Sequence, residues 1–130
     1  MKNNKGQSLV DVIFSMGIVV LVLTGVIILV VSTAKVKRLA FERQKAVELS
    51  QLLIEYKILE SKNDPSGFWN DGSYGINTKP VSDFGSDFSG YSYTINHDIG
   101  CNNQSCKMIF TINWSDQSLL VERFFSRKGI

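Results

Sequence analysis

The residue with the clearest potential for chemistry is Asp11, a carboxylate placed inside a long apolar segment. A short basic leader that ends in Lys5 and Gly6 precedes the segment, and Gln7 stands four residues before the acid. A carboxylate within a membrane-spanning helix costs about 2.5 to 3.5 kcal/mol near the helix centre and less near an end. Because of this cost, such a residue is usually retained for a specific interaction.

Residues 5–11, of sequence KGQSLVD, and the apolar residues that follow them resemble the class III signal of type IV pilins and pseudopilins. The resemblance implies that a prepilin peptidase cuts between Gly6 and Gln7, and that Gln7 becomes an N-methylated amino terminus. It also implies that Asp11 pairs with a terminal amine during assembly, where an opposite charge within about 4 to 6 Å lowers the pKa of an acid. The family most often has Phe or Met at the position of Gln7 and Glu at that of Asp11.

The apolar segment is expected to form a helix that crosses a bilayer. It runs from Leu9 to Val31, and its roughly 23 residues correspond to about 35 Å of helix. A secretory signal has an apolar core of only about 7 to 15 residues, so we expect this segment to be kept. No second apolar run of that length follows, which predicts a single-pass membrane protein. The resemblance implies that the membrane is the cytoplasmic membrane. The resemblance implies that the C-terminal domain lies outside, and later in an extracellular pilus or a periplasm-spanning filament.

The distribution of basic residues favours the opposite orientation. The leader contributes two lysines, whereas the far side of the apolar segment carries Lys35, Lys37, Arg38, Arg43 and Lys45. By the positive-inside rule, the far side would be cytoplasmic. We follow the resemblance, because the peptidase of that family cuts on the cytoplasmic face. Removal of the leader lysines would take the net charge from +2 to zero, which does not obstruct close packing in a filament.

Residues 32–61 contain no Gly or Pro and predict a continuation of the same helix. Their apolar positions fall roughly on one stripe, which consists of Val36, Ala40, Val47, Leu52, Leu53, Tyr56 and Leu59. A helix of about 50 residues would reach about 75 Å, so part of it must contact lipid or other helices. The apolar half lacks the proline that kinks this helix in many major pilins, which favours a minor subunit.

Residues 62–90 are rich in Gly, Ser, Asn and Asp and contain both prolines of the chain, which predicts a long connecting loop. Several aromatic residues are spread through it: Phe68, Trp69, Tyr74, Phe84 and Phe88. They are too many for a disordered linker, so we expect most of them to fold back on the helix as core. The alternative is an exposed aromatic binding surface.

Residues 91–130 predict a small antiparallel meander that packs against the long helix, which gives an α+β fold. Apolar and polar residues alternate over residues 91–98, at the period of a half-buried strand. The inner face of the next strand is expected to consist of Met108, Phe110, Ile112 and Trp114. A turn over residues 115–118 would place Trp114 opposite Leu119 and Ile112 opposite Val121.

Cys101 and Cys106 lie in the predicted connection between the first two strands. Their spacing is short enough for a disulfide across the mouth of a hairpin, which we favour over two reduced thiols. Zinc normally takes four ligands, and His97 is the only histidine, so the chain cannot assemble a recognisable Cys and His site. We expect neither a metal nor a cofactor.

Enzymatic and nucleic-acid functions find little support in the sequence. One histidine, no nucleophile motif, no phosphate-binding glycine loop and no paired-carboxylate signature leave no visible catalytic set. From Lys62 onward, six basic and seven acidic residues give no electrostatic footprint for nucleic acid. We therefore expect a protein that is not an enzyme.

The resemblance implies a structural, minor subunit of a type IV pilus or a pilus-like filament. Its partners would be the prepilin peptidase and methyltransferase, other pilin subunits, the inner-membrane assembly platform and, before assembly, membrane lipid. One alternative within the family is a pseudopilin of type II secretion or DNA-uptake machinery. An alternative of another class is a single-pass, membrane-anchored extracellular binding domain in which Asp11 is incidental.

The predicted cleavage can be tested by mass spectrometry of the intact protein and its N-terminal peptide, purified from the membranes of its own host. We expect a chain that begins at N-methylated Gln7, because the leader would be removed after Gly6. A chain that keeps residues 1–6 in cells with active prepilin peptidase would contradict the prediction.

Overall fold

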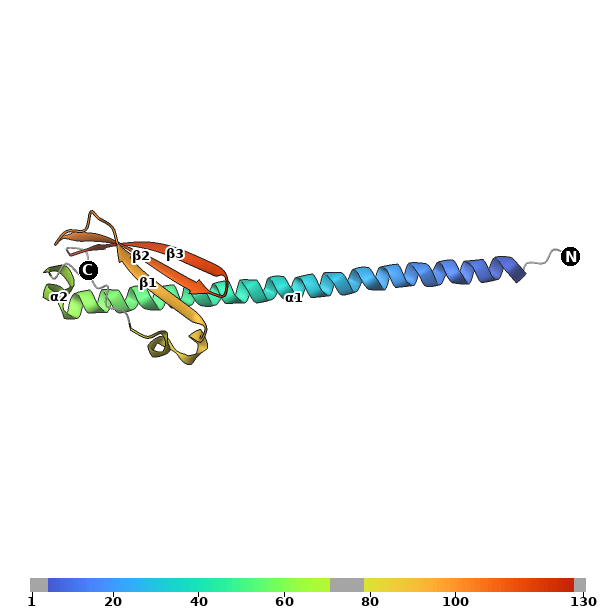
Figure 1. Ribbon diagram of the computed structural model, residues 1–130, viewed down its shortest axis with the longest axis horizontal. Coiled ribbons are helices and arrows are strands. Elements are labelled where there is room, and N and C mark those ends of the chain that lie inside the picture. Colours follow the sequence, from blue (N-terminus) through green and yellow to red (C-terminus); the bar gives the residue numbers. More distant parts are fainter. Residues whose placement is uncertain (1–4, 71–78, 128–130) are drawn as a thin grey trace. The chain divides into compact units, whose positions relative to one another are not determined.

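A computed structural model describes the backbone of residues 5–70 and 79–127 and the side chains of residues 8–69 and 79–127 (Figure 1). The predicted fold class is confirmed, because a long N-terminal helix packs against a three-stranded antiparallel sheet of order β1-β2-β3. The helices are α1 (Lys5–Asn63) and α2 (Pro65–Asn70), and two 3-10 turns follow them, η1 (Val81–Phe84) and η2 (Ser86–Phe88). The strands are β1 (Tyr91–His97), β2 (Ser105–Trp114) and β3 (Gln117–Ser126).

The chain divides into two compact units between Phe41 and Glu42. The first unit contains the N-terminal part of α1, and the second contains the remainder of α1, helix α2 and the sheet. All buried hydrophobic residues of the core belong to the second unit. The two units are described separately below.

The segment predicted as a loop begins with a capped helical turn, α2. The Oδ1 atom of Asp64 accepts hydrogen bonds from the backbone N–H of Gly67 and from the Ser66 hydroxyl, both at 3.0 Å. These two bonds, the backbone bond first, lower the pKa of the Asp64 carboxyl. A Cβ atom at position 67 would collide with the same carboxylate, so a larger residue there would displace the side chain that makes the cap. The cap lets the chain reverse direction directly after α1 ends.

The buried face of α1 in the second unit differs from the predicted apolar stripe. Its fully buried positions recur every three or four residues and are Ala46, Leu49, Ser50, Leu53, Lys57 and Ser61. Of the predicted stripe, Leu53 is buried, but Val47 and Leu59 are 40% and 57% exposed. The buried set includes the large Leu49, Leu53 and Lys57 as well as small residues, so burial follows the side of the helix and not the size of the side chain. The hydroxyls of Ser50 and Ser61 donate to backbone carbonyls three residues back, at 2.6 and 2.7 Å, so neither is unsatisfied.

Lys57 is the one charged side chain on this buried face among the described residues, and it is fully buried. Its Nζ atom donates to Oε2 of Glu60 at 2.6 Å and lies 5.1 Å from the ring centroid of Tyr56. A buried ammonium requires such a partner, because its desolvation would otherwise cost several kcal/mol. Glu60 keeps 24% of its side chain exposed, so it links the buried charge to solvent.

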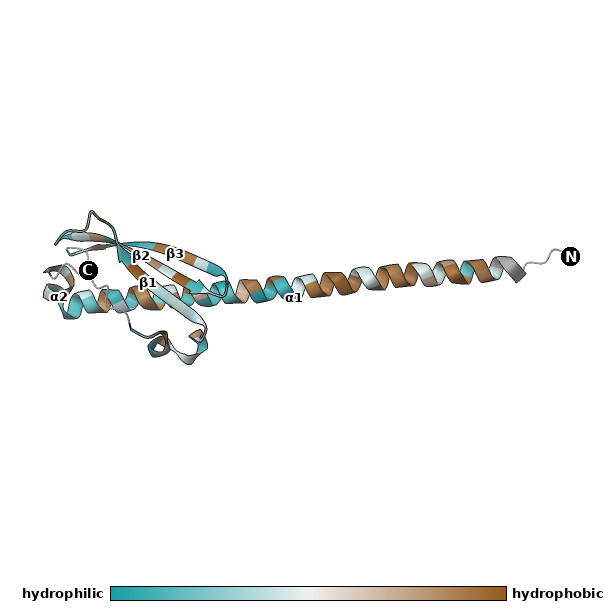
Figure 2. Cartoon of the chain, in the orientation of Figure 1, coloured by the Kyte–Doolittle hydropathy of each residue, from teal (hydrophilic) through white to brown (hydrophobic). Residues whose placement is uncertain are grey.

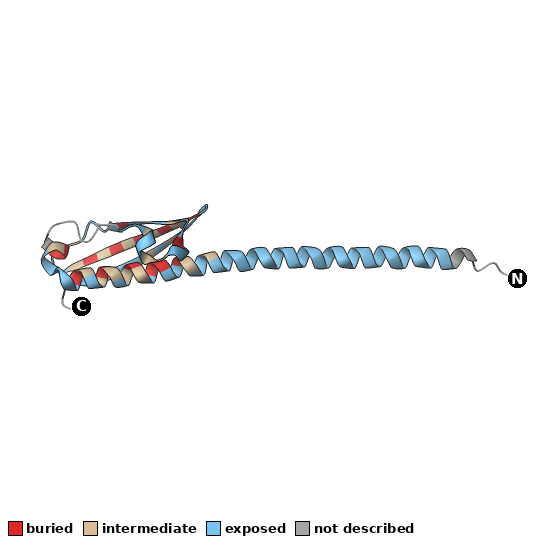
Figure 3. Ribbon diagram, turned by 90° about the horizontal axis from the view of Figure 1, so that it is seen from below, coloured by how far each residue is buried: buried red, intermediate tan, exposed pale blue. Residues whose placement is uncertain are grey.

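The predicted faces of the sheet are confirmed. On β2, alternate residues from Cys106 to Trp114 are buried, and Ile95 is buried on β1 (Figure 3). Tyr91 and Tyr93 are partly buried on the same face of β1, and burial raises the pKa of both phenols. The alternating pattern of apolar residues was therefore sufficient to orient these two strands.

The predicted register between β2 and β3 is wrong by two residues. Trp114 lies opposite Gln117, Ile112 opposite Leu119 and Phe110 opposite Val121. The turn consists of Ser115 and Asp116 alone, and Ser115 adopts a φ of 50°. Two-residue turns with positive φ match the twist of a hairpin better than a wider turn does. A shift of two residues keeps every side chain on its face, so the hydrophobic pattern cannot detect it.

Aromatic residues of the connecting segment fold back into the core, as predicted. Phe68, Trp69 and Phe88 are at most 3% exposed, whereas Phe84 is half-buried. The predicted Tyr74 lies outside the described residues. The described chain resumes at Lys79. The backbone N–H of Lys79 donates a hydrogen bond to the Tyr93 hydroxyl at 2.8 Å, and this hydroxyl donates to the Lys79 carbonyl at 2.7 Å. This reciprocal pair fixes the segment against β1.

The corrected helix face can be tested with one substitution at two positions. Leu53→Ala should lower the free energy of unfolding of the second unit by about 2 to 5 kcal/mol, because it leaves a cavity in the core. Leu59→Ala, at an exposed site of the same helix, should change it by less than about 0.5 kcal/mol. Chemical denaturation of the full chain in detergent measures both values. Equal losses for the two variants would contradict the face assigned here.

Candidate functional site: the apolar half of the N-terminal helix and the disulfide loop

The first unit begins with an apolar helical segment whose described side chains are exposed. Figures 2 and 3 show its apolar composition and its exposure along α1. The large apolar side chains from Leu9 to Val31 are each 51 to 74% exposed. By length and composition this helix could cross a membrane. Apolar surface of this extent is stable only against lipid or other protein, since its exposure to water costs roughly 25 cal/mol per Å².

The hydroxyl groups of this helix are satisfied within the helix itself. Ser15 and Thr24 donate to the carbonyls of Val12 and Val20, at 2.9 and 2.8 Å. Ser32 and Thr33 both donate to the carbonyl of Leu29, at 3.0 and 2.8 Å. In hydrocarbon no water can satisfy a polar group, so internal bonds of this kind suit a membrane environment. The helix therefore presents no free hydroxyl between Ser15 and Thr33.

Asp11 is the only charged residue between Ser8 and Ala34, and its side chain is exposed. No described side chain forms a hydrogen bond or an ion pair with it. Helix neighbours at spacings of three and four are Gln7, Ser8, Phe14 and Ser15, none of which is cationic. Among the described side chains, none therefore supplies a positive partner for this carboxylate.

The predicted cleavage site lies at the start of α1. The backbone of Gly6 and Gln7 belongs to the helix, and their side-chain surroundings fall outside the described residues. Residues 1–4 of the predicted leader also lie outside the described part of the chain. The cleavage between Gly6 and Gln7 and the N-methylation of Gln7 thus stay predictions.

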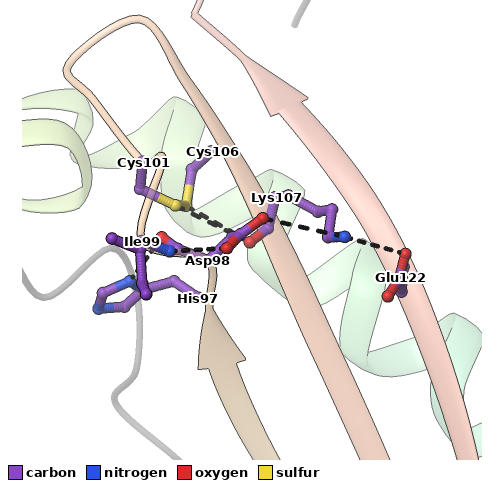
Figure 4. Close-up of polar contacts among 7 residues, drawn as sticks. All are labelled: His97, Asp98, Ile99, Cys101, Cys106, Lys107 and Glu122. Atoms are coloured by element: carbon purple, nitrogen blue, oxygen red, sulfur yellow. Dashed lines mark hydrogen bonds and ion pairs between the residues drawn. A yellow bond between two sulfur atoms is a disulfide. The ribbon is translucent and has the colours of Figure 1, made fainter.

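The predicted disulfide between Cys101 and Cys106 is confirmed, and it closes the connection between β1 and β2 (Figure 4). The two Cα atoms are 4.2 Å apart, and Cys106 is buried opposite Phe125 of β3. The bridge therefore ties the loop to the core through Cys106.

Backbone and side-chain hydrogen bonds hold the same loop. The Cys101 N–H donates to the Asp98 carbonyl at 3.2 Å, and the Asn102 N–H donates to the Ser105 carbonyl at 2.9 Å. The Oδ1 atom of Asn102 accepts from the backbone N–H groups of Gln104 and Ser105, both at 2.9 Å. Such a side-chain bond mimics a backbone turn and fixes loop shape. Ile99 remains fully exposed in this braced connection.

On the outer face of the sheet, Lys107 joins the loop to β3. Its Nζ atom lies 3.2 Å from Oε2 of Glu122 and 3.9 Å from Oδ2 of Asp98 (Figure 4). The three side chains are 24 to 51% exposed. Ion pairs at such exposed positions contribute about 0 to 1 kcal/mol each. This cluster positions the loop and offers no catalytic arrangement.

No protein-family model, no curated protein and no solved structure matches this chain. In residues 5–70 and 79–127, no group of three or more His, Cys, Asp or Glu side chains lies close enough to hold a metal ion. His97 contacts the backbone carbonyl of Asp98 through Nδ1, at 3.2 Å.

Sequence reasoning missed two features of the second unit. One is the buried Lys57, which the sequence places between Tyr56 and Ile58. The other is an open hollow lined by Arg43, Trp114 and the first residues of β3. No spacing pattern indicates either feature, because both depend on how the sheet lies on α1.

The contribution of the disulfide can be tested with Cys101→Ser, which breaks the bond and keeps Cys106 in the core. Closing so small a ring should contribute about 2 kcal/mol, so the free energy of unfolding should fall by about that amount. Amide hydrogen exchange should quicken at residues 102–105. A reducing agent should reproduce this effect in the wild type and have none on Cys101→Ser. Unchanged stability and exchange in the variant would contradict a structural role for the bond.

Proposed function

We propose that this chain is a structural, minor subunit of a type IV pilus or a pilus-like filament. In this proposal a prepilin peptidase removes residues 1–6, Gln7 becomes the methylated terminus, and the chain catalyses no reaction of its own. The observation that carries the proposal is an exposed apolar helical segment whose one charged residue, Asp11, is the fifth residue after the predicted cleavage point.

The exposed helix supports two successive environments. Its apolar side chains and internally bonded hydroxyls suit lipid, where the precursor would reside. The same surface suits close packing against other apolar helices, because lipid and helix neighbours solvate apolar side chains equally well. A subunit that moves from the membrane into a filament core exchanges lipid neighbours for helix neighbours. Its apolar side chains stay away from water in both places, so the exchange costs little free energy.

Asp11 supports the choice of assembly over simple anchoring. A carboxylate in hydrocarbon is costly, and none of its helix neighbours at spacings of three and four is a cation that could offset that cost. Cleavage after Gly6 would create a terminal amine at Gln7, which is the missing positive charge. In the filament, the amine of one subunit and the Asp11 carboxylate of another would neutralise each other, which favours a fixed register between helices.

The second unit would be the head of the subunit, held outside the membrane. Its core and its disulfide stabilise it independently of the apolar helix. The family alternative, a pseudopilin of type II secretion or DNA-uptake machinery, would use the same helix and head.

A second candidate is a membrane-anchored extracellular binding domain. The observation that favours it is the fully exposed Ile99 in a loop braced by the disulfide and by hydrogen bonds. An exposed apolar residue on a rigid loop suits contact with a partner protein. In this case Asp11 would have no role in assembly.

The two candidates differ in what happens when Asp11 is replaced. Asp11→Ala should reduce incorporation into filaments about a hundredfold or more, because breaking a buried ion pair costs about 3 to 5 kcal/mol. Asp11→Glu, which restores the carboxylate, should keep incorporation within a few-fold of the wild type. Immunoblotting of sheared filaments against membrane fractions from the native host measures both.

Membrane insertion serves as the control. Asp11→Ala should insert at least as well as the wild type, because it removes a charge from the apolar segment. Normal filament incorporation of a well-inserted Asp11→Ala protein would overturn the proposal and favour the anchored binding domain.

A further inference from the structure

A hollow of about 350 Å³ opens in the second unit between α1 and the β2–β3 hairpin, and its lining is rich in hydrogen-bond donors. Its wall consists of Arg43, Trp114, Gln117, Ser118 and Leu119. The guanidinium, indole, carboxamide and hydroxyl groups of the first four can all donate hydrogen bonds. None of the five lining residues carries a carboxylate.

The indole of Trp114 supplies the most specific observation. Trp114 is 5% exposed, and its Nε1 atom is buried with no hydrogen-bond partner. Trp69, the other tryptophan, has no such unsatisfied atom. Buried N–H groups in native proteins almost always have an acceptor, so this orphan in a residue of the wall points to an acceptor that the described chain does not supply.

Arg43 supplies the charge. It is exposed, and it forms no ion pair with any residue that the structure describes. Its helix neighbours at spacings of three and four are Leu39, Ala40, Ala46 and Val47, so its own helix offers no acidic partner. A guanidinium with no carboxylate beside it is suited to a bidentate contact with an external oxyanion.

The fold holds these two residues near each other through Tyr91. The Tyr91 ring stacks on Trp114 with centroids 6.0 Å apart, and its hydroxyl donates to the carbonyl of Glu42 at 3.0 Å. Glu42 directly precedes Arg43 in α1. In the sheet, Trp114 also pairs with Gln117, which brings the first residues of β3 to the same wall.

We propose that this hollow binds a phosphate group through Arg43, the Nε1–H of Trp114, and the side chains of Gln117 and Ser118. Donors from four residues match the three or four oxygens of a phosphate better than the two of a carboxylate. Asp116 lies in the adjacent turn but does not belong to the wall. The inference is independent of the proposed role in a filament.

The test uses the ¹⁵N-labelled full chain in zwitterionic detergent micelles and follows its two indole N–H resonances. Sodium phosphate is titrated at constant ionic strength, with sodium chloride as the balancing salt. The Trp114 resonance should shift and saturate, while that of Trp69, which is 1% exposed in α2, should stay in place. A shift that never saturates, or equal shifts of both indoles, would overturn the proposal.

Two charge-removing variants separate a built site from general attraction. Arg43→Gln should weaken phosphate binding about tenfold or more, because a charge-assisted hydrogen bond is lost. Lys35→Gln removes the same charge from the first unit and should leave the binding constant unchanged. Unaltered binding by Arg43→Gln, or equal weakening by both variants, would show an adventitious ion only.

The source of the phosphate is tested by replacing the free ion with lipid. Micelles containing phosphatidylglycerol should shift the Trp114 resonance, relative to phosphatidylcholine, if a phosphodiester headgroup occupies the hollow. A response to inorganic phosphate alone would assign the site to a soluble phosphate compound. A Trp114 resonance that responds to neither would overturn the proposal.

Discussion

The arrangement of the second unit depends on how closely the sheet can approach α1. The inner face of β2, with Met108 and Phe110, packs in one core with a helix face that carries Ala46, Leu49 and Leu53. Protein interiors are packed to the density of organic crystals, so the shapes of the two surfaces must match. The same approach encloses Lys57, and it brings Trp114 beside Arg43.

The first unit obeys a different constraint, because its helix has no protein core to join. Its side chains from Leu9 to Val31 remain exposed, and its hydroxyls bond within the helix. A helix that is apolar on every side is stable in lipid or among similar helices, and unstable in water. One carboxylate in such a surface is costly, and this cost gives Asp11 its importance in the proposed assembly.

The comparison of prediction and structure separates two kinds of information. Strand faces were predicted correctly, because alternation along a strand directly reports which side is buried. The β2–β3 register was wrong by two residues, because any even shift preserves that alternation and only the turn geometry selects one. The helix stripe was partly wrong for a related reason. Leu59 lies on an exposed side of α1 and Ser50 on the buried side, and hydrophobicity alone does not indicate which side the sheet covers.

The sequence by itself determined the α+β class, the long apolar helix, the inner faces of β1 and β2, and the pairing of Cys101 with Cys106. These features follow from local composition, from the period of apolar residues and from cysteine spacing, all of which can be read from residues close together in the sequence. Only the tertiary structure decided which side of α1 is buried, where β3 pairs, and which donors surround the hollow at Arg43. Those outcomes depend on the shape and volume of surfaces that meet from distant parts of the chain, and no local pattern encodes such a fit.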